Sequence, residues 1–364
     1  MQDLMDVYGN PSSIHGEGTK SRKILEVARR KVAQQINCTA KRIVFTGCGS
    51  ESNNLAIKGV AFAHRGEKNH IITSSVEHPA VIQTCQWLEK YGFRVTYLLV
   101  DKTGLVSPDD LQKAITDQTC LVTIMLANNE TGSIQPIREM VKITKERNIL
   151  FHTDAVQAIG KIPVDVEVLG VDLLTLSAHK FHGPKGVGAL YIRKDVPLEG
   201  LIHGGGHEGG VRSGTENVLG IAGFGKVMEY VPQYITRMKE VQKLRDRLEE
   251  GLQKTVKDFH LNGHRSKRLP NTLNVTLPDY RGESIVLEMD KRGVCFSSGS
   301  ACHSGSSEPS HALLAMGLTE EDAHCALRFS LGYETHEEDI EKVIQLFEEV
   351  IHQSKHIVRF VSCK

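Results

Sequence analysis

The chain has 364 residues, of which 40% are apolar and 24% charged, a composition typical of a globular protein. Lysine plus arginine and aspartate plus glutamate each number 44, so the formal net charge is zero. A balanced charge gives no long-range attraction to nucleic acid or to an anionic membrane, so neither is expected as a direct partner. No apolar run approaches the roughly 18 residues that cross a bilayer, and the first residues do not resemble a secretory signal. We therefore expect a cytoplasmic protein.

The eight cysteines are scattered along the chain and include no Cys-x-x-Cys pair. This spacing argues against a disulfide framework or a zinc knuckle. It suits a reducing compartment, in which one thiol can be chemically active while the others pack.

Helices and strands alternate through the first half of the chain. Residues 21–36 place apolar side chains on one helical stripe, and helices are also expected near residue 49, from Pro79 and after the Ser107 cap. Apolar strands are expected at 42–47, 71–76, 94–100, 120–127, 149–154, 172–177 and 188–193. Strands that are apolar on both faces and separated by helices predict a mostly parallel α/β sheet covered by helices.

The pattern changes near residue 235. A long charged helix at about 235–257 leads into a strand at 271–278, and the chain closes with another helical pattern. We therefore expect a large domain over 10–235 and a smaller C-terminal α/β domain over 236–364, with residues 1–9 packing on the smaller domain.

Two charged residues follow neighbouring strands of the predicted sheet. Asp154 ends one strand, and Lys180 follows the next strand, 26 residues later, which is enough for one crossover to a parallel strand. Ligands bind beyond the carboxyl ends of such strands, so both side chains are expected at one crevice. A lysine amine and a carboxylate are what pyridoxal 5'-phosphate (PLP) requires, for its Schiff base and its ring nitrogen.

A phosphate seat is expected at the turn of residues 47–52. This Gly/Ser turn lies between a strand and a helix, where free backbone N–H groups and the helix dipole favour an anion. Ser50, Ser177 and His179 can add side-chain donors.

Eight motifs occur in the order of one known family. They are FTGCGSESNNLAIKG, SSVEHPAV, ANNETG, HTDAVQAIGK, LSAHKFHGPKG, GGGHEGGVRSGTEN, SSGSACHSGSSEPS and ALRFSLG. Together they resemble the cysteine desulfurases of the NifS/IscS family, within the class-V aminotransferases and the fold-type I PLP enzymes, from about Tyr8 to about residue 350. The resemblance implies an enzyme that converts L-cysteine to L-alanine and passes sulfur, through a persulfide, to an acceptor or scaffold protein in sulfur and iron–sulfur cluster biosynthesis.

The resemblance also implies roles for single residues. Lys180 would form the Schiff base, Asp154 would hold the ring nitrogen, and His78 would stack on the ring and move protons. Gln157 and Asn129 would contact the ring oxygen or the substrate carboxylate, and Arg328 would clamp that carboxylate. The remaining residues would hold the phosphate: Ser50, the backbone of Glu51, Ser177, His179 and, from the neighbouring subunit of a homodimer with shared sites, Thr215.

Cys302 would accept the sulfur. It lies in a small-residue, Gly/Ser-rich stretch that is too polar for a core, and the long segment around it resembles the desulfurase group whose cysteine lies on a mobile loop. Cys295, inside the apolar run Val-Cys-Phe, is expected to be a packing residue instead.

Several alternatives accompany this interpretation. Residues 204–209 match Gly-x-Gly-x-x-Gly, but they do not stand between a first strand and a helix, so a dinucleotide site is rejected. A selenocysteine lyase has a similar cysteine motif, and a cofactor-bearing scaffold with little turnover is the alternative from another class. Two departures from the family pattern are noted: Ser50 replaces a common Thr, and no Ala-Thr-Thr-Pro turn precedes Tyr8.

Overall fold

The computed structural model describes residues 6–299 and 308–353, which form two compact units. Unit 1 contains the chain up to Leu98, together with Val106–Leu126 and Gln135–Gln233. Unit 2 contains Leu99–Leu105, Ala127–Ile134 and the chain from Tyr234. The two short segments in unit 2, and the placement of residues 6–9 in unit 1, were not anticipated from the sequence.

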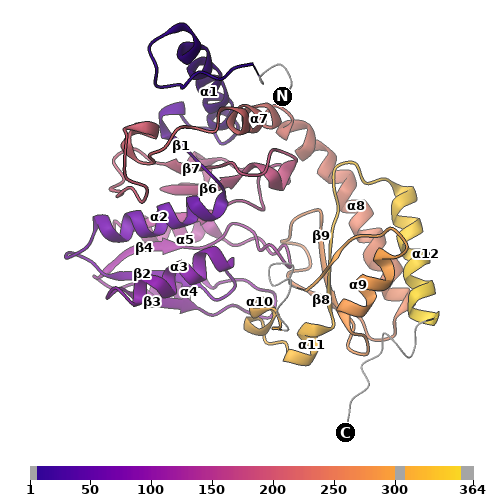
Figure 1. Cartoon of the computed structure of the whole chain (residues 1–364). Coiled ribbons are helices and arrows are strands. Elements are labelled where there is room, and N and C mark those ends of the chain that lie inside the picture. The colour runs from indigo at the N-terminus through magenta and orange to yellow at the C-terminus, as the bar shows by residue number, and fades with distance from the viewer. Residues whose placement is uncertain (1–5, 300–307, 354–364) are drawn as a thin grey trace. The chain divides into compact units, whose positions relative to one another are not determined.

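Unit 1 is built on a seven-stranded sheet in the order β1-β7-β6-β5-β4-β2-β3. Strands β6, β5, β4, β2 and β3 are parallel, whereas β7 runs antiparallel to both of its neighbours. Helices flank the sheet (Figure 1), which confirms the predicted fold class. The strands are β1 (Ile43–Thr46), β2 (His70–Ser74), β3 (Arg94–Leu98), β4 (Thr119–Thr123), β5 (Leu150–Asp154), β6 (Leu173–Ser177) and β7 (Gly188–Ile192).

The helices of unit 1 begin where the sequence supplies caps. The Ser107 hydroxyl accepts a hydrogen bond from the Asp110 N–H at the start of α4, and Pro108 occupies the first turn, as predicted. The helices are α1 (Gly16–Gln35), α2 (Gly49–Ala63), α3 (Pro79–Glu89), α4 (Pro108–Ala114), α5 (Ile137–Lys145), α6 (Val166–Leu169), α7 (Val218–Met228) and the 3-10 turns η2 (Ala40–Arg42), η3 (Ala178–Phe181) and η4 (His207–Gly210).

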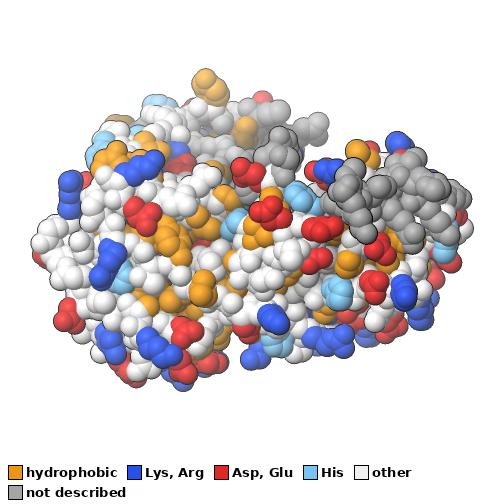
Figure 2. All heavy atoms as spheres, turned by 90° about the horizontal axis from the view of Figure 1, so that it is seen from below, with side chains coloured by type: hydrophobic (Ala, Val, Ile, Leu, Met, Phe, Trp, Pro, Cys, Tyr) orange, Lys and Arg blue, Asp and Glu red, His pale blue; other side chains and the backbone are white. Residues whose placement is uncertain are grey.

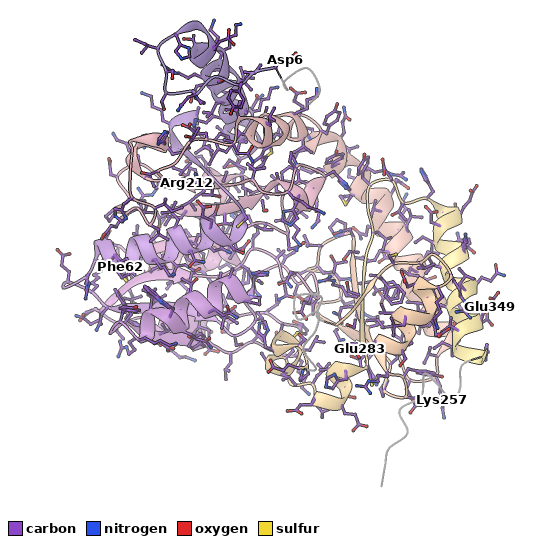
Figure 3. All side chains as sticks on the ribbon, viewed as in Figure 1. Asp6, Phe62, Arg212, Lys257, Glu283 and Glu349 are labelled. Carbon is purple, nitrogen blue, oxygen red and sulfur yellow. The ribbon has the colours of Figure 1, made fainter. Side chains whose placement is uncertain are left out.

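Aromatic contacts and apolar strands make the core of unit 1. Strands β2, β4, β5 and β6 are buried almost throughout, as expected for strands apolar on both faces. On α2, Phe62 packs edge-on against Trp87 and Phe93 (Figure 3), with ring centroids 6.1 and 6.4 Å apart. The burial fixes α2 against the sheet, and with it the turn that precedes the helix.

The glycine-rich loop after β7 is tied to the edge strand β1. Glu208 has a left-handed backbone (φ 48°), and its carboxylate accepts two hydrogen bonds of 2.7 Å from the Arg29 guanidinium and one of 2.7 Å from the Phe45 N–H. Residues 204–209 therefore form a loop that includes part of the η4 turn and is held by hydrogen bonds of Glu208. They do not begin a helix after a strand. The rejection of a dinucleotide site at this motif is thereby supported by its structural context.

Unit 2 contains a four-stranded antiparallel sheet in the order β10-β11-β9-β8. Its buried core is formed by apolar side chains of the sheet and of the helices, including Leu273, Leu327 and Phe347. The elements are β8 (His260–Asn262), β9 (Thr272–Thr276), β10 (Ser297–Ser298), β11 (Ala326–Ser330), α8 (Val231–Thr255), α9 (Gly282–Asp290), α10 (His311–Ala315), α11 (Glu320–His324) and α12 (Glu337–Gln353).

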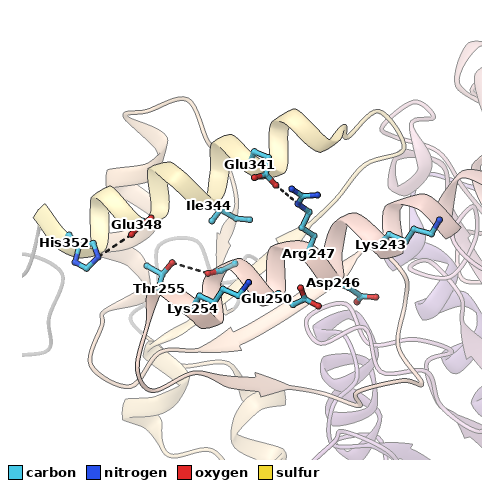
Figure 4. Close-up of a pocket in the computed structure, with 11 residues that line it drawn as sticks. Lys243, Asp246, Arg247, Glu250, Lys254, Thr255, Glu341, Ile344, Glu348 and His352 are labelled. Carbon is cyan, nitrogen blue, oxygen red and sulfur yellow. Dashed lines mark hydrogen bonds and ion pairs between the residues drawn. The ribbon is translucent and has the colours of Figure 1, made fainter.

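Helices α8 and α12 approach closely because Gly251 has no side chain. A Cβ atom at this position would overlap Ile344 of α12. Beside this contact, Arg247 of α8 forms an ion pair with Glu341 of α12 (Figure 4). It forms a second ion pair with Glu337. The groove between the two helices is lined mainly by charged side chains and contains none of the residues predicted for the site.

Cys295 is exposed, so its prediction as a packing residue was wrong. Its neighbours Val294 and Phe296 are half-buried against the core of unit 2, and the ring of Phe296 stacks on Phe329 at 4.3 Å. The side chains on both sides of Cys295 thus pack inward, whereas its own thiol faces solvent. Its thiol lies 3.5 Å from an Asp290 carboxylate oxygen, and this contact raises the pKa of the thiol.

Charges of both signs are mixed on the face drawn in Figure 2, as the zero net charge requires. Among the described residues, no helix is long and apolar enough to cross a membrane. Nor do any three His, Cys, Asp or Glu side chains of residues 6–299 and 308–353 group in a way that could hold a metal ion.

We predict that buried His152 makes unit 1 sensitive to acid. Its ring nitrogens lie 2.8 Å from the Thr123 hydroxyl and 3.0 Å from the Thr175 hydroxyl, and burial lowers its pKa to about 3. Unfolding exposes a ring that takes up a proton below about pH 6.5, so stability falls as the pH drops from there toward 3.

At pH 5, the His152 ring should lower the free energy of unfolding by about 2 kcal/mol relative to pH 7. Urea unfolding at pH 7 and pH 5 should therefore show a smaller acid-induced loss in His152→Gln than in the wild type. An unchanged difference between the two pH values would contradict the prediction.

Candidate active site

The site in unit 1 is organised by the parallel pairing of β5 with β6. Asp154, the last residue of β5, stands opposite Thr175 of β6. Strand β6 ends at Ser177, and the η3 turn that follows carries His179 and Lys180, both exposed. The expectation that Asp154 and Lys180 come from neighbouring parallel strands is confirmed, and the positive charge of Lys180 acts on the Asp154 carboxyl.

Asp154 is a buried carboxyl with two defined hydrogen bonds. It is 7% exposed, and its oxygens accept bonds from the Val156 N–H at 2.9 Å and from the Asn53 side-chain amide at 2.7 Å. Burial raises the pKa of Asp154, while the Asn53 and Val156 bonds and the charges of His78 and Lys180 oppose that rise. These donors favour the ionised carboxylate in an environment that would otherwise protonate it.

Asn53 was missed by the sequence analysis. It lies on α2 and is 1% exposed, and its Oδ1 atom accepts no hydrogen bond from any described residue. Asn54, the next residue, is half-buried, and its side-chain amide donates to the Ser50 carbonyl of its own helix. Nothing in the local pattern of Ser, Asn and Asn distinguishes the two, because only the tertiary fold decides which amide faces β5.

The turn before α2 comes close to the ends of β5 and β6. A Cβ atom added at Gly49 would lie 3.0 Å from a Val156 methyl group and 3.3 Å from the Ser177 Cβ. The Ser177 hydroxyl lies 3.0 Å from Nδ1 of His179, whose pKa is lowered by burial and by the charges of Lys180 and Lys185. The turn, Ser177 and His179, which the sequence analysis combined in one phosphate seat, thus lie together.

Ser50 and Glu51 occupy the first turn of α2 in different ways. Ser50 is exposed. The Glu51 N–H donates to the Cys48 thiol at 3.4 Å, and the Glu51 carboxylate accepts from the Gly47 N–H at 2.7 Å. The structure therefore uses Glu51 mainly to close its own turn.

The loop that carries Thr215 is fastened to this turn. Arg212 (labelled in Figure 3) donates to the Glu51 carboxylate at 2.8 Å. Thr215 itself is exposed. Together with the Glu208 contact at β1, this ion pair gives the loop two attachments within unit 1.

His78 and Gln157 complete the predicted set in unit 1. His78 is half-buried and caps α3, its Nδ1 atom accepting a hydrogen bond from the Ala80 N–H at 3.1 Å. His78 is therefore the N-cap of this helix. Gln157 is half-buried and accepts a bond of 2.8 Å from Lys161.

Unit 2 brings Arg328 and Asn129 together. Arg328 lies on β11, opposite Ser297 of β10 and Asn274 of β9. Its guanidinium donates to the Asn129 carbonyl at 3.0 Å and to the Ser297 hydroxyl at 3.2 Å, whereas its buried Nε atom has no hydrogen-bond partner among the described residues. Cys302 lies outside the described residues.

Two further buried carboxyls were also missed. Glu77, directly before His78, and Glu130, directly after Asn129, are 0% and 3% exposed, and burial raises their pKa to about 8 and about 7. Glu130 accepts a hydrogen bond of 2.5 Å from Ser310, the cap of α10. Each is adjacent in sequence to a residue predicted for the site, and this adjacency is the signal by which the sequence could have indicated them.

We predict that Asn53→Leu raises the pKa of Asp154 further in the cofactor-free protein. Leucine keeps the volume but removes a donor to a carboxylate, a bond worth about 1.5–3 kcal/mol. The carboxyl ¹³C signal of Asp154, identified by its loss in Asp154→Asn, should titrate at higher pH. Asn54→Leu is the matched control and should leave the signal unchanged. Identical titrations in both variants would contradict the role given to Asn53.

Comparison with known proteins places this site in a family. The model of the family described as aminotransferase class-V matches residues 1–343. A protein named cysteine desulfurase IscS from Dictyoglomus turgidum is 51% identical over 355 residues, covering 97% of this chain and 90% of the relative. A protein of the same name from Methanosarcina thermophila is 52% identical over 355 residues, covering 97% and 88%.

Solved structures give the same result. A NifS-like protein superposes with a TM-score of 0.90 at 41% identity, covering 96% of this chain and 93% of the other. DndA from Streptomyces lividans superposes with a TM-score of 0.77 at 34% identity, covering 90% and 96%.

Family members depend on PLP, and the residues of unit 1 fit that group. The buried, donor-supported carboxyl of Asp154 suits a protonated ring nitrogen, exposed Lys180 suits a covalent link, and the glycine turn before α2 suits a phosphate. From this match and from the sequence identities, the chain belongs to the class-V aminotransferase family.

Proposed function

We propose that this protein is a PLP-dependent cysteine desulfurase, which takes sulfur from L-cysteine, releases L-alanine and carries the sulfur as a persulfide on Cys302. The observation that carries the proposal is the pairing of β5 with β6, which brings buried Asp154 and Lys180 to the same edge of the sheet. The high identity to proteins named cysteine desulfurase supports the choice of substrate within the family.

Bound PLP would supply the means to stabilise negative charge at the α-carbon of the substrate. Lys180 would hold the cofactor covalently and, once displaced by the substrate amine, take the α-proton on Nζ. Asp154 would hold the positive charge of the ring nitrogen, and its hydrogen bonds from Asn53 and Val156 favour the ionised form that this task needs.

The phosphate would be held at the start of α2. Ser50, the Glu51 backbone, Ser177 and His179 would provide donors, supported by the dipole of the helix. Thr215 would reach the phosphate of a second subunit, which makes the protein a homodimer with shared sites. The two attachments of its loop, at Arg29 and at Glu51, support a fixed position for this residue within its own subunit.

His78, Gln157 and Asn129 would act around the ring and the substrate. His78 would stack on the ring face and move protons from an orientation set by its cap on α3. Gln157 and Asn129 would contact the ring oxygen or the substrate carboxylate. Asn129 contributes through its side chain, since its carbonyl already accepts from Arg328.

Arg328 would bind the carboxylate of the substrate. Two of its nitrogens donate to Asn129 and Ser297, which fixes the plane of the guanidinium. Its buried Nε remains without a hydrogen-bond partner among the described residues. A planar guanidinium is suited to a carboxylate, which it can meet with two parallel hydrogen bonds.

Cys302 would perform the sulfur transfer. Its thiolate attacks the substrate sulfur, a sulfur–sulfur bond forms, and the carbon–sulfur bond of the substrate breaks. The electron pair left on the carbon takes up a proton, and Lys180 would return a proton to the α-carbon, so that alanine is released. A free thiol has a pKa of roughly 8.5, so the site must favour the thiolate at the moment of attack.

The persulfide would then be passed to a sulfur-acceptor or scaffold protein of sulfur and iron–sulfur cluster biosynthesis, within the cytoplasm. The even mixture of surface charges gives no reason to expect a nucleic acid as a direct partner.

The test is the release of alanine and sulfide from L-cysteine in the presence of PLP and a reductant. Cys302→Ala should lose both products while it keeps the visible absorption of bound cofactor, because the thiol acts after the cofactor is loaded. Cys295→Ala is the matched control: this exposed thiol lies seven residues earlier and should leave both rates unchanged. Full activity in Cys302→Ala, or its loss in Cys295→Ala, would refute the assignment of the acceptor thiol.

We expect Arg328→Lys to weaken substrate binding. Lysine keeps the positive charge but cannot offer two parallel hydrogen bonds, nor can it keep the contacts to Asn129 and Ser297. The KM for cysteine should rise about tenfold or more, which corresponds to the loss of one charge-assisted bond. Cofactor content, measured by absorption, should not change. An unaltered KM would show that the carboxylate is bound elsewhere.

A further inference from the structure

Two buried carboxyls in unit 1 follow or end strands that both pair with β4, and only one of them has a role in the proposed function. Asp154 ends β5, whereas Glu77 follows β2 and directly precedes His78. The side chain of Glu77 is 0% exposed. An acid buried so completely is costly unless its oxygens are hydrogen-bonded, so its contacts indicate what it is kept for.

The contacts of Glu77 connect the His78 segment to a neighbouring strand. One carboxyl oxygen accepts hydrogen bonds from the Ser74 hydroxyl at 2.6 Å and from the Met125 N–H at 2.9 Å, and the other lies 3.1 Å from the same N–H. Met125 follows β4, which pairs with β2. Glu77 therefore fixes the backbone immediately before His78 to the carboxyl end of β4.

Burial favours the neutral form of Glu77. Together with the negative charge of Asp154, it raises the pKa of Glu77 to about 8, against the effect of the Ser74 and Met125 bonds. His78 is the adjacent basic group. Near neutral pH the Glu77 carboxyl thus retains its proton.

We propose that Glu77 is a positioning residue, which holds His78 in place through the hydrogen bonds of its buried carboxyl group to Ser74 and Met125. The inference rests on the proposed function in so far as it assigns proton transfer to His78. It extends that function to a residue whose contacts described above are all within the fold. His78 thereby gains a fixed orientation.

The pH dependence gives the proposal a signature that a merely structural role does not have. Above about pH 8, Glu77 ionises and places a negative charge directly before His78. The wild-type kcat should therefore fall on the alkaline side. Glu77→Gln stays neutral at all pH values and keeps an acceptor for Ser74 and Met125. It should retain kcat within about threefold at pH 7 and lack the part of the alkaline fall that Glu77 causes.

Glu77→Leu removes every hydrogen bond of the side chain. Its kcat should fall about tenfold or more with little change in KM, because His78 loses its placement. Thr73→Val is the matched control. Thr73 is fully buried on β2, four residues before Glu77, and donates to the Thr123 carbonyl of β4 at 2.9 Å, so it also connects β2 to β4 through a side-chain hydrogen bond. It should unfold more easily and keep kcat.

A second measurement does not depend on turnover. In the cofactor-free protein, the Cε1–H NMR signal of His78, identified by its loss in His78→Gln, should shift or broaden in Glu77→Leu and stay in place in Thr73→Val. If neither variant moves this signal, the positioning role is refuted whatever the enzyme does. If the signal moves but no variant, nor the wild type, releases alanine, the proposed function is refuted and the positioning role stands. If kcat falls equally at alkaline pH in Glu77→Gln and in the wild type, the proposal is also overturned.

Discussion

The parallel pairing of β5 with β6 is the constraint on which the site in unit 1 depends. It sets Asp154 opposite Thr175 and thereby brings the acid and the η3 turn with Lys180 to one edge of the sheet. The glycine turn before α2 reaches the same edge because Gly49 lacks a side chain that would meet Val156 and Ser177. Backbone pairing thus assembles three segments that are far apart in the sequence, before any side chain is considered.

Burial then decides how the ionisable groups at this edge behave. Asp154 and Glu77 are both buried, but their donors differ. Asp154 accepts from an amide side chain and lies within the field of two basic groups, whereas Glu77 accepts from a hydroxyl and a backbone N–H and lies within the field of Asp154. Burial raises the pKa of both carboxyls, but the groups that oppose this rise differ between them.

In unit 2, hydrogen bonds likewise fix Arg328, the proposed ligand of the substrate carboxylate. Arg328 is held by a carbonyl from the segment Ala127–Ile134 and by a hydroxyl from β10, and the neighbouring Glu130 is bonded to the cap of α10. The segment that contains Asn129 is grouped with unit 2 although the rest of its surroundings in sequence belongs to unit 1. Asn129, a proposed substrate ligand, thus belongs to a short segment of unit 2 that the hydrophobic pattern of the sequence does not predict.

The sequence by itself determined the alternation of buried strands and helices, the mostly parallel sheet, the Ser107 cap of α4, and the identity of the residues at the strand ends, because these follow from local periodicity and from motifs. The tertiary structure decided which polar residues became partners. It distinguished Asn53 from Asn54, since only one of two adjacent amides on α2 faces β5. It turned Cys295 outward, because its neighbours Val294 and Phe296 both pack against the core of unit 2. It also gave Glu77 and Glu130 their buried hydrogen bonds, which depend on residues brought together from distant parts of the chain.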